Sequence, residues 1–190
     1  MSTHGKIIII TAPSGAGKTS ITHYLLQQFP LLTFSISATT RAPRGTEQHG
    51  VEYYFLGEAD FKQRIQAGEF LEWEMVYEGK YYGTLKSEMN RIWSEGKVPV
   101  LDIDVKGAIH VQQQYPGQTL SLFIEAPSVA ELRRRLESRG TETPESLHTR
   151  ISKAEYEMSF RHKFDAVVVN DVLAEAQAAA AGHVQSFLER

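Results

Sequence analysis

A glycine-rich stretch near the start of the chain has the composition and spacing of a phosphate cradle. It follows an apolar run, Ile7–Thr11, and precedes a helical pattern of apolar residues. The glycines allow consecutive backbone N–H groups to surround an anion, and the helix adds its positive end. Lys18 is expected to reach the β- and γ-phosphates of ATP, and the Thr19 hydroxyl to bind Mg²⁺ directly. The predicted ATP-binding residues of this loop are Ala12, Pro13, Ser14, Gly15, Ala16, Gly17, Lys18 and Thr19.

The loop departs from the usual G-x-x-x-x-G-K-[ST] pattern at its first position, which is Ala12. An alanine there excludes only the conformations that need glycine, while Gly15 and Gly17 remain in the crowded part of the loop. The competing interpretation is a glycine-rich turn without a ligand. The strand–loop–helix context and the Gly-Lys-Thr ending favour the phosphate cradle.

A second anion site is predicted between residues 35 and 55. Arg41 and Arg44 lie three residues apart among serines, threonines and tyrosines. Forked guanidinium groups can grip a phosphate through paired donors. Two arginines alone would favour a solvated basic turn, but a chain with a separate ATP cradle also needs an acceptor site. We therefore expect a second phosphate to bind here.

Two aspartates end the apolar run Val98–Asp104. Asp102 and Asp104 are expected on one face of a strand at its carboxyl end, where ligands of open α/β sheets bind. Buried carboxylates are costly unless a cation or a hydrogen-bond donor offsets them. Ordinary solvated strand-end acids are the alternative. Proximity to Thr19 in the predicted fold favours contact of Asp102 or Asp104 with Mg²⁺ through water.

A charged segment from Ser128 to about Met158 predicts two polar helices joined by a short turn. Ser128 and Glu131 form the first capping box, Gly140 ends that helix, and Thr143 begins the next. A solvated basic face is the simpler interpretation of either helix alone. Together they indicate a mobile lid that closes on ATP and stabilises charge in the transition state through Arg135, Arg139 and Arg150.

The apolar runs predict the fold that positions these residues. Helical patterns separate them, as expected of an α/β fold with a parallel sheet flanked by helices. Residues 38–85 break the alternation and predict a small, mostly β insertion. Asn170, which ends the last run, is expected either on the adenine side of ATP or in a plain turn. The predicted core strands are Ile7–Thr11, Val98–Asp104, Leu120–Glu125 and Ala166–Asn170, joined by Leu32–Ser37, and the insertion has strand-like pieces at Glu52–Leu56 and Phe70–Val76.

Composition limits the classes of function. The 190 residues, 42% hydrophobic and 23% charged, suit one globular domain. A net charge of −3 provides no global basic field, so nucleic acid is not an expected partner. The absence of cysteine excludes disulfides and fits a reducing compartment, and the apolar stretch at the N-terminus is too short for a signal peptide or membrane span. We expect a cytoplasmic protein with no membrane contact, and a homodimer remains open.

Several of these motifs resemble those of guanylate kinases. The stretch from Ser35 to Phe55 is similar to that family's signature, as are Phe70-Leu-Glu-Trp and Lys80-Tyr-Tyr-Gly-Thr further along. The lid sequence from Arg135 to Thr141 is also similar, so the resemblance covers nearly the whole chain. Bacterial members commonly have Ala at the first loop position. Lys106 stands where relatives usually carry Gln.

The resemblance implies a single domain that transfers the γ-phosphate of ATP to GMP with Mg²⁺ as cofactor. The core would comprise residues 1–37, 86–127 and 159–190, the GMP-binding lobe residues 38–85, and the lid residues 128–158. Glu72 and Thr84, with the two aspartates, would address the guanine edge and metal-bound waters; an exposed edge strand is the alternative for Glu72. The implied GMP-phosphate ligands are Ser37, Arg41, Arg44, Tyr53 and Tyr82, with Glu47 bracing the arginines.

Two other functions remain open on sequence alone. One is a non-catalytic guanylate-kinase-like module that grips a phosphopeptide, against which the intact Lys18, Thr19 and lid arginines argue. The other is a related kinase for a ribose bisphosphate, against which Glu72 and the Tyr81-Tyr82-Gly83-Thr84 turn argue, because they favour a purine base. For a guanylate kinase the phosphate oxygen of GMP is the attacking group, so no protein nucleophile is needed.

Overall fold

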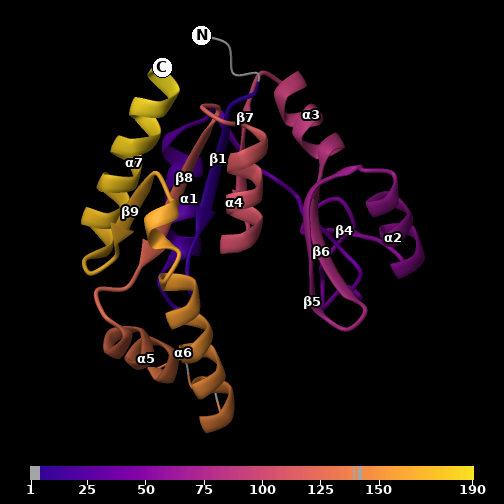
Figure 1. The fold of residues 1–190 in the computed structure, drawn as a ribbon. Helices are drawn as coiled ribbons and strands as arrows, with labels where there is room; N and C mark the ends of the chain where they lie inside the picture. The colour runs from indigo at the N-terminus through magenta and orange to yellow at the C-terminus, as the bar shows by residue number, and fades with distance from the viewer. Residues whose placement is uncertain (1–4, 139, 141–142) are drawn as a thin grey trace.

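Five parallel strands form the central sheet of the computed structural model, which describes residues 5–138, 140 and 143–190 (Figure 1). The strand order is β2-β7-β1-β8-β9, and every neighbouring pair runs in parallel. This arrangement confirms the predicted α/β core. The strands are β1 (Ile7–Thr11), β2 (Leu32–Phe34), β7 (Val98–Asp102), β8 (Thr119–Glu125) and β9 (Ala166–Val169).

The isoleucine run of β1 reflects its place at the centre of this sheet. Side chains alternate between faces along a strand, so a strand covered on both sides must be apolar at every position. Ile8 and Ile10 pack in the cluster that contains residues of α1 and α7, whereas Ile7 and Ile9 pack against α3 and α4. These helices are α1 (Lys18–Gln28), α3 (Lys86–Ser94), α4 (Val105–Gln114) and α7 (Leu173–Glu189).

The predicted strand Val98–Asp104 is two residues too long. β7 ends at Asp102, and Asp104 is instead the N-cap of α4. Its Oδ1 accepts a hydrogen bond of 2.7 Å from the backbone N–H of Gly107. A carboxylate at this position satisfies an N–H group that the helix itself leaves unpaired, and this outweighs continuation of the strand.

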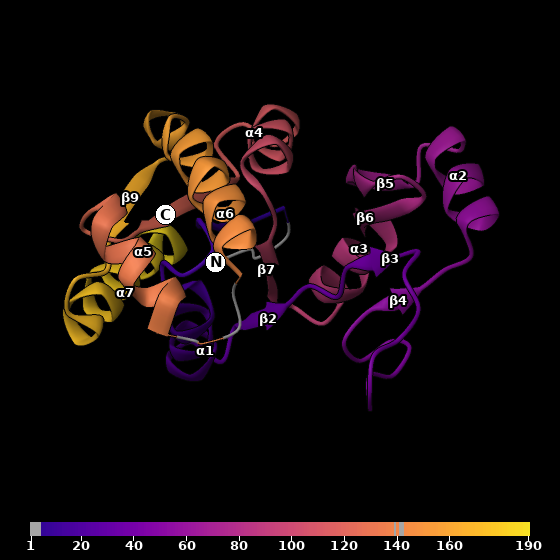
Figure 2. The same ribbon diagram turned by 90° about the horizontal axis from the view of Figure 1, so that it is seen from below.

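Residues 38–85 contain a second sheet, with strand order β4-β3-β6-β5. They also contain a helix, α2 (Glu58–Gln66), that the sequence prediction omitted. Phe61 and Ile65 lie four residues apart on α2, and the Phe61 ring stacks on Phe70 at 4.3 Å between centroids. Figure 2 shows this lobe standing to one side of the core. Its strands are β3 (Ala38–Thr39), β4 (Tyr54–Phe55), β5 (Phe70–Tyr77) and β6 (Lys80–Leu85).

The charged segment forms two helices, α5 (Val129–Ser138) and α6 (Pro144–Met158), that pack on each other beyond the end of the sheet (Figure 1). Ser128 and Thr143 accept backbone hydrogen bonds from Glu131 and Ser146, as expected of N-caps. A short 3₁₀ helix, Arg161–Lys163, leads back to β9. Within the described part of the chain, no helix has the length and apolar character needed to cross a membrane.

Candidate functional site

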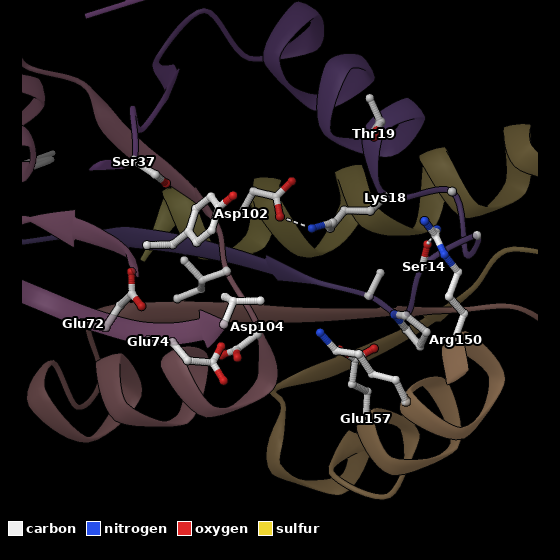
Figure 3. A pocket seen from close by; sticks show the side chains of 18 of the residues that line it. Ser14, Lys18, Thr19, Ser37, Glu72, Glu74, Asp102, Asp104, Arg150 and Glu157 are labelled. Atoms are coloured by element: carbon white, nitrogen blue, oxygen red, sulfur yellow. Dashed lines mark hydrogen bonds and ion pairs between the residues drawn. The ribbon is translucent and has the colours of Figure 1, made fainter. Parts of the chain in front are cut away.

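A cavity of about 530 Å³ opens where the glycine-rich loop, the second sheet and α6 meet (Figure 3). It lies at the carboxyl ends of β1 and β7, the edge at which open α/β sheets bind ligands. Most of the loop lines this cavity, together with side chains predicted for the acceptor and the lid. The predicted residues at the cavity are Ala12, Pro13, Ser14, Gly15, Gly17, Lys18, Thr19, Ser37, Tyr53, Glu72, Tyr82, Asp102, Asp104 and Arg150.

Two glycines give the loop its shape. Gly15 and Gly17 have φ values of 94° and 96°, a region that other residues rarely adopt. Asn170 lies directly behind the loop, where its Nδ2 donates a hydrogen bond of 2.8 Å to the Ala16 carbonyl. A Cβ atom at Gly17 would approach that Nδ2 to 2.1 Å. The buried side chain of Asn170 therefore occupies the space beside Gly17 and supports the loop there.

We predict that Gly17→Ala disrupts this loop much more than Gly68→Ala disrupts its own turn. Both glycines have positive φ, but a Cβ at Gly68 would meet nothing within 4 Å. The backbone strain alone costs about 1–2 kcal/mol, so Gly68→Ala should destabilise the fold by that amount and leave ATP binding intact. Gly17→Ala also displaces Asn170, and we expect a loss of about 2–4 kcal/mol with ATP binding abolished. Thermal unfolding and ATP titration measure both effects; equal behaviour of the two variants would contradict this role of Gly17.

The lid helices rest directly on the loop. A Cβ at Gly15 would lie 3.1–3.2 Å from methyl groups of Leu136 and Leu132, two buried leucines of α5. From α6, Arg150 donates a hydrogen bond of 3.0 Å from Nη1 to Ser14 Oγ. Figure 3 shows Arg150 reaching from α6 toward Ser14. Both lid helices, α5 and α6, are thus in direct contact with the loop.

Lys18, at the first turn of α1, forms an ion pair with Asp102 across the cavity. Burial lowers the pKa of Lys18 to about 8, and the nearby carboxylates of Glu157 and Asp104 oppose this effect. The ammonium therefore remains charged at neutral pH. It sits at a helix N-terminus beside backbone N–H groups, which makes this end of the cavity a strong anion site.

Glu72 lies at the other end of the cavity on β5, where it is only 8% exposed. Its Oε1 accepts a hydrogen bond of 2.6 Å from the Thr84 hydroxyl of β6. Its Oε2 lies close to Gly107 in the first turn of α4, 3.0 Å from where a Cβ at that glycine would stand. Burial raises the pKa of Glu72 to about 7, with the Thr84 hydrogen bond acting in the opposite direction. A buried carboxylate held so firmly is ready for a ligand with hydrogen-bond donors.

Arg41 and Glu47 form a bidentate pair, with Nη–Oε distances of 2.6 and 2.7 Å. The hydrogen bond from Arg41 lowers the pKa of Glu47 to about 2, aided by the backbone N–H of Arg44. The Arg41 guanidinium also lies 4.7 Å from the centre of the Tyr53 ring, and Tyr53 lines the cavity. The two arginines themselves stand outside the cavity lining. The Glu47 carboxylate thus holds the side chain of Arg41 and the backbone N–H of Arg44.

The remaining predicted residues hold the site rather than line it. Arg135 donates from Nε to Glu131 at 2.7 Å and from Nη2 to the Asn170 carbonyl at 2.9 Å, which ties α5 to the end of β9. Ala16 is fully buried beneath the loop. Arg139 lies outside the described residues. Neither Arg135 nor Asn170 is among the residues that line the cavity.

Three charged residues at the cavity were absent from the sequence predictions. Lys153 and Glu157 follow Arg150 on α6 at intervals of three and four, so all three side chains share one helix face. Glu74 follows Glu72 on β5 at the strand interval of two. The periodicity of each element could have identified them once one neighbour was assigned. Predicting which face meets the cavity requires the tertiary fold.

The oxygen donors near Lys18 suit Mg²⁺ held jointly with a nucleotide. The Thr19 hydroxyl and the carboxylates of Asp102 and Asp104 line the cavity, and hard oxygen donors are the ligands that Mg²⁺ prefers. In the described ranges, no group of three or more His, Cys, Asp or Glu side chains is arranged to hold a metal ion. Such a sparse donor set fits a cation that keeps its waters and shares the oxygens of a triphosphate.

Comparison with known proteins finds guanylate kinases among its sequence and structure matches. A family model described as guanylate kinase matches residues 4–190. The guanylate kinase of Bacteroides fragilis is 52% identical over 183 residues, covering 96% of this chain and 90% of that protein. That of Salinibacter ruber is 49% identical and covers 96% of both chains. Among solved structures, the guanylate kinase of Anaplasma phagocytophilum has a TM-score of 0.74 at 28% identity, covering 96% of this chain and 85% of that one.

Proposed function

The chain belongs to the guanylate kinase family, and we infer from this premise that it transfers the γ-phosphate of ATP to GMP, giving ADP and GDP. The observation that carries the conclusion is a cavity with two unlike ends. One end is a cationic loop for a triphosphate, and the other is a buried carboxylate, Glu72, for a base with donors. A ribose bisphosphate offers no base for that carboxylate.

We propose that ATP binds along the glycine-rich loop. The backbone N–H groups between Ser14 and Thr19 and the Lys18 ammonium would surround its β- and γ-phosphates. To do so, Lys18 must leave Asp102 for the phosphates, and this exchanges one anion for another at the same ammonium. Arg150 already contacts Ser14 at the loop and is placed to follow the phosphates.

GMP is proposed to bind between the second sheet and α4. Glu72 would accept from guanine N1–H and the 2-amino group, while Thr84 keeps its carboxylate in place and Gly107 leaves room beside it. The phosphate of GMP would extend toward Tyr53, beside which Arg41 is held by Glu47. Ser37, Tyr82 and Arg44 complete the proposed phosphate contacts, with Asp102 and Asp104 between the two nucleotides.

The residues of this chain act by alignment and charge. The GMP phosphate oxygen attacks the γ-phosphorus, the bond from that phosphorus to the bridging oxygen breaks, and ADP leaves. Two anions must approach each other, so Lys18, Arg41 and the lid cations Arg135, Arg139 and Arg150 would offset their repulsion. Thr19 and Asp102 or Asp104 would hold Mg²⁺, which supplies positive charge at the β- and γ-phosphate oxygens when bound.

We propose that the GMP-binding lobe, residues 38–85, and the lid helices α5 and α6 both close on the nucleotides. Arg41 and Arg44 are not among the residues that line the cavity, and inward movement of residues 38–85 would bring them toward a phosphate bound there. Closure would also exclude water, which could otherwise take the γ-phosphate. The lid would move toward bound ATP because Arg150 is placed to contact the phosphates.

We predict that kcat/KM for GMP falls as the pH drops through about 7. Only the ionised carboxylate of Glu72 accepts both guanine donors, and burial raises its pKa to about 7, so acid protonates the group that GMP needs. The decline should approach tenfold per pH unit. The GMP phosphate also titrates, near pH 6, and adds its own decline at lower pH. The effect of Glu72 is therefore recognised by the limb of the pH profile near pH 7, which should be absent in Glu72→Gln.

Glu58→Gln is the control for this profile, because Glu58 pairs with Lys62 on the exposed surface of α2 and does not line the cavity. The limb near pH 7 should survive in Glu58→Gln. Survival of that limb in Glu72→Gln would remove Glu72 from the guanine site.

We propose a cytoplasmic enzyme with ATP and GMP as its partners. The cysteine-free composition and the net charge of −3 support a reducing compartment and argue against nucleic acid as a ligand. We propose no membrane contact. Every residue assigned above comes from one chain, so the proposed site does not require a homodimer.

A further inference from the structure

Glu74 has no role in the mechanism above, yet it lines the cavity. β5 turns Glu72, Glu74 and Val76 toward the cavity and leaves Trp73 and Met75 exposed on the other side. Glu72 pairs in register with Thr84 and Glu74 with Tyr82, so Glu74 lies closer to the tip of the β5–β6 hairpin. Its carboxylate is therefore carried on the part of the acceptor lobe that extends beyond the guanine site.

The partner of Glu74 in this structure is another acid. Its carboxyl group faces that of Asp104, and Figure 3 shows the two carboxyl groups side by side. Two carboxylates in contact repel each other unless a proton or a cation lies between them. A cation would thus be a more favourable partner for Glu74 than Asp104 is.

Two lysines on different elements act on Glu74. Lys153 of α6 lines the same cavity as Glu74, and both Lys153 and Lys106 of α4 are close enough to act on Glu74 electrostatically, Lys153 more strongly. The Lys106 ammonium lies 5.8 Å from the centre of the Tyr156 ring, in a contact between α4 and the lid. The Lys153 ammonium lies at the cavity, 3.8 Å from Glu157 Oε1, and its side chain is 64% exposed. That distance exceeds a hydrogen bond, so Lys153 can turn without breaking one to Glu157.

We propose that Glu74 and Lys153 form an ion pair when the enzyme closes. This pair, called the clasp below, would join the acceptor lobe (residues 38–85) to the lid (α5 and α6). The clasp rests on the proposed function, because closure around ATP and GMP brings its two sides together. Lys153 replaces Asp104 as the partner of Glu74, which leaves Asp104 for the nucleotides and their waters. Both are positioning residues, since neither contacts a reacting atom.

The clasp links the two nucleotides energetically. GMP draws in the lobe that carries Glu74, and ATP holds the lid that carries Lys153, so each ligand should strengthen binding of the other. Without the pair, each nucleotide still contacts its own residues. The clasp therefore affects the cooperation between the sites and leaves the affinity for a single nucleotide unchanged.

The test is a double-mutant cycle on GMP affinity. Isothermal titration gives the GMP Kd with and without a saturating ATP analogue whose γ-phosphate cannot be transferred. The wild type should bind GMP on the order of tenfold more tightly with the analogue. Glu74→Gln and Lys153→Met should each lose roughly threefold of that gain, with the Kd for GMP alone unchanged. The double variant should lose no more than either single variant.

Lys62→Met is the matched control, because Lys62 pairs with Glu58 on the exposed surface of α2, away from the cavity. It should retain the full gain. Losses that multiply in the double variant would overturn the clasp, as would an unchanged gain in both single variants. A weaker GMP Kd without the analogue in Lys153→Met would overturn it in favour of a direct phosphate contact. Turnover of GMP by the wild type separates these outcomes from failure of the proposed function.

Discussion

Lys18→Met should lower kcat by at least on the order of 10²–10³-fold while the protein remains folded. The Lys18 ammonium is the cation proposed at the β- and γ-phosphates, where charge is redistributed as the phosphoryl group moves. Methionine keeps most of the length and apolar contact of the side chain and removes the charge. Because the effect is on the transition state, kcat should fall more than the KM for ATP rises. Steady-state kinetics at saturating ATP and GMP measure the change.

The fold should tolerate this substitution because Asp102, which loses its partner, keeps access to solvent. Its side chain is 30% exposed, so water can hydrate the carboxylate. Thermal unfolding and GMP titration should therefore stay close to the wild type. Lys62→Met, the same change at an exposed ion pair of α2, should leave kcat unaltered. A folded Lys18→Met enzyme with near-normal turnover would contradict the assignment of the glycine-rich loop.

Glu72→Gln should lower kcat/KM for GMP by on the order of 10²-fold and leave ATP affinity nearly unchanged. The carboxylate accepts two charge-assisted hydrogen bonds from guanine, whereas the amide oxygen of glutamine accepts without charge and its nitrogen opposes a donor. Thr84 would also lose its charged acceptor, so part of the effect is a less firmly held side chain. Kinetics with GMP varied at saturating ATP, and the reverse, measure the two effects.

Glu58→Gln is the control for this substitution, since Glu58 pairs with Lys62 on the outside of α2. It should leave both kinetic constants unchanged. Unaltered GMP kinetics in Glu72→Gln would remove the guanine assignment from β5 and leave only the transfer of phosphate from ATP. An equal loss for ATP and GMP would instead indicate a general disturbance of the cavity.

Sequence patterns predicted the loop and the core because both depend on local rules. The glycines of the loop must adopt positive φ wherever such a cradle forms, and the isoleucines of β1 must be apolar on both faces. Helix α2 was missed because its short amphipathic pattern lies among strand-like residues. Its Phe61 is apolar for packing on Phe70, a contact that only the folded lobe creates.

The parts of the site that the sequence could not predict come from contacts between distant elements. Arg135 carries the charge expected of a phosphate ligand, and in this structure the carbonyl of Asn170 and the carboxylate of Glu131 hold it outside the cavity lining. Glu74 and Lys153 are ordinary surface residues by type. Their meeting at one cavity depends on how the lobe and the lid stand against the core, and no spacing along the chain encodes that arrangement.

The central claim, that this enzyme phosphorylates GMP from ATP, is tested most directly by ADP release with a panel of acceptors. GMP, AMP, UMP and a ribose bisphosphate are each supplied with ATP and Mg²⁺ to the wild-type protein. Adenine has no 2-amino group and an acceptor at N1, so it would leave Glu72 buried and unpaired. We predict rapid ADP release with GMP and a kcat/KM for AMP lower by on the order of 10⁴-fold. Equal efficiency with AMP, or preference for the ribose bisphosphate, would contradict the account.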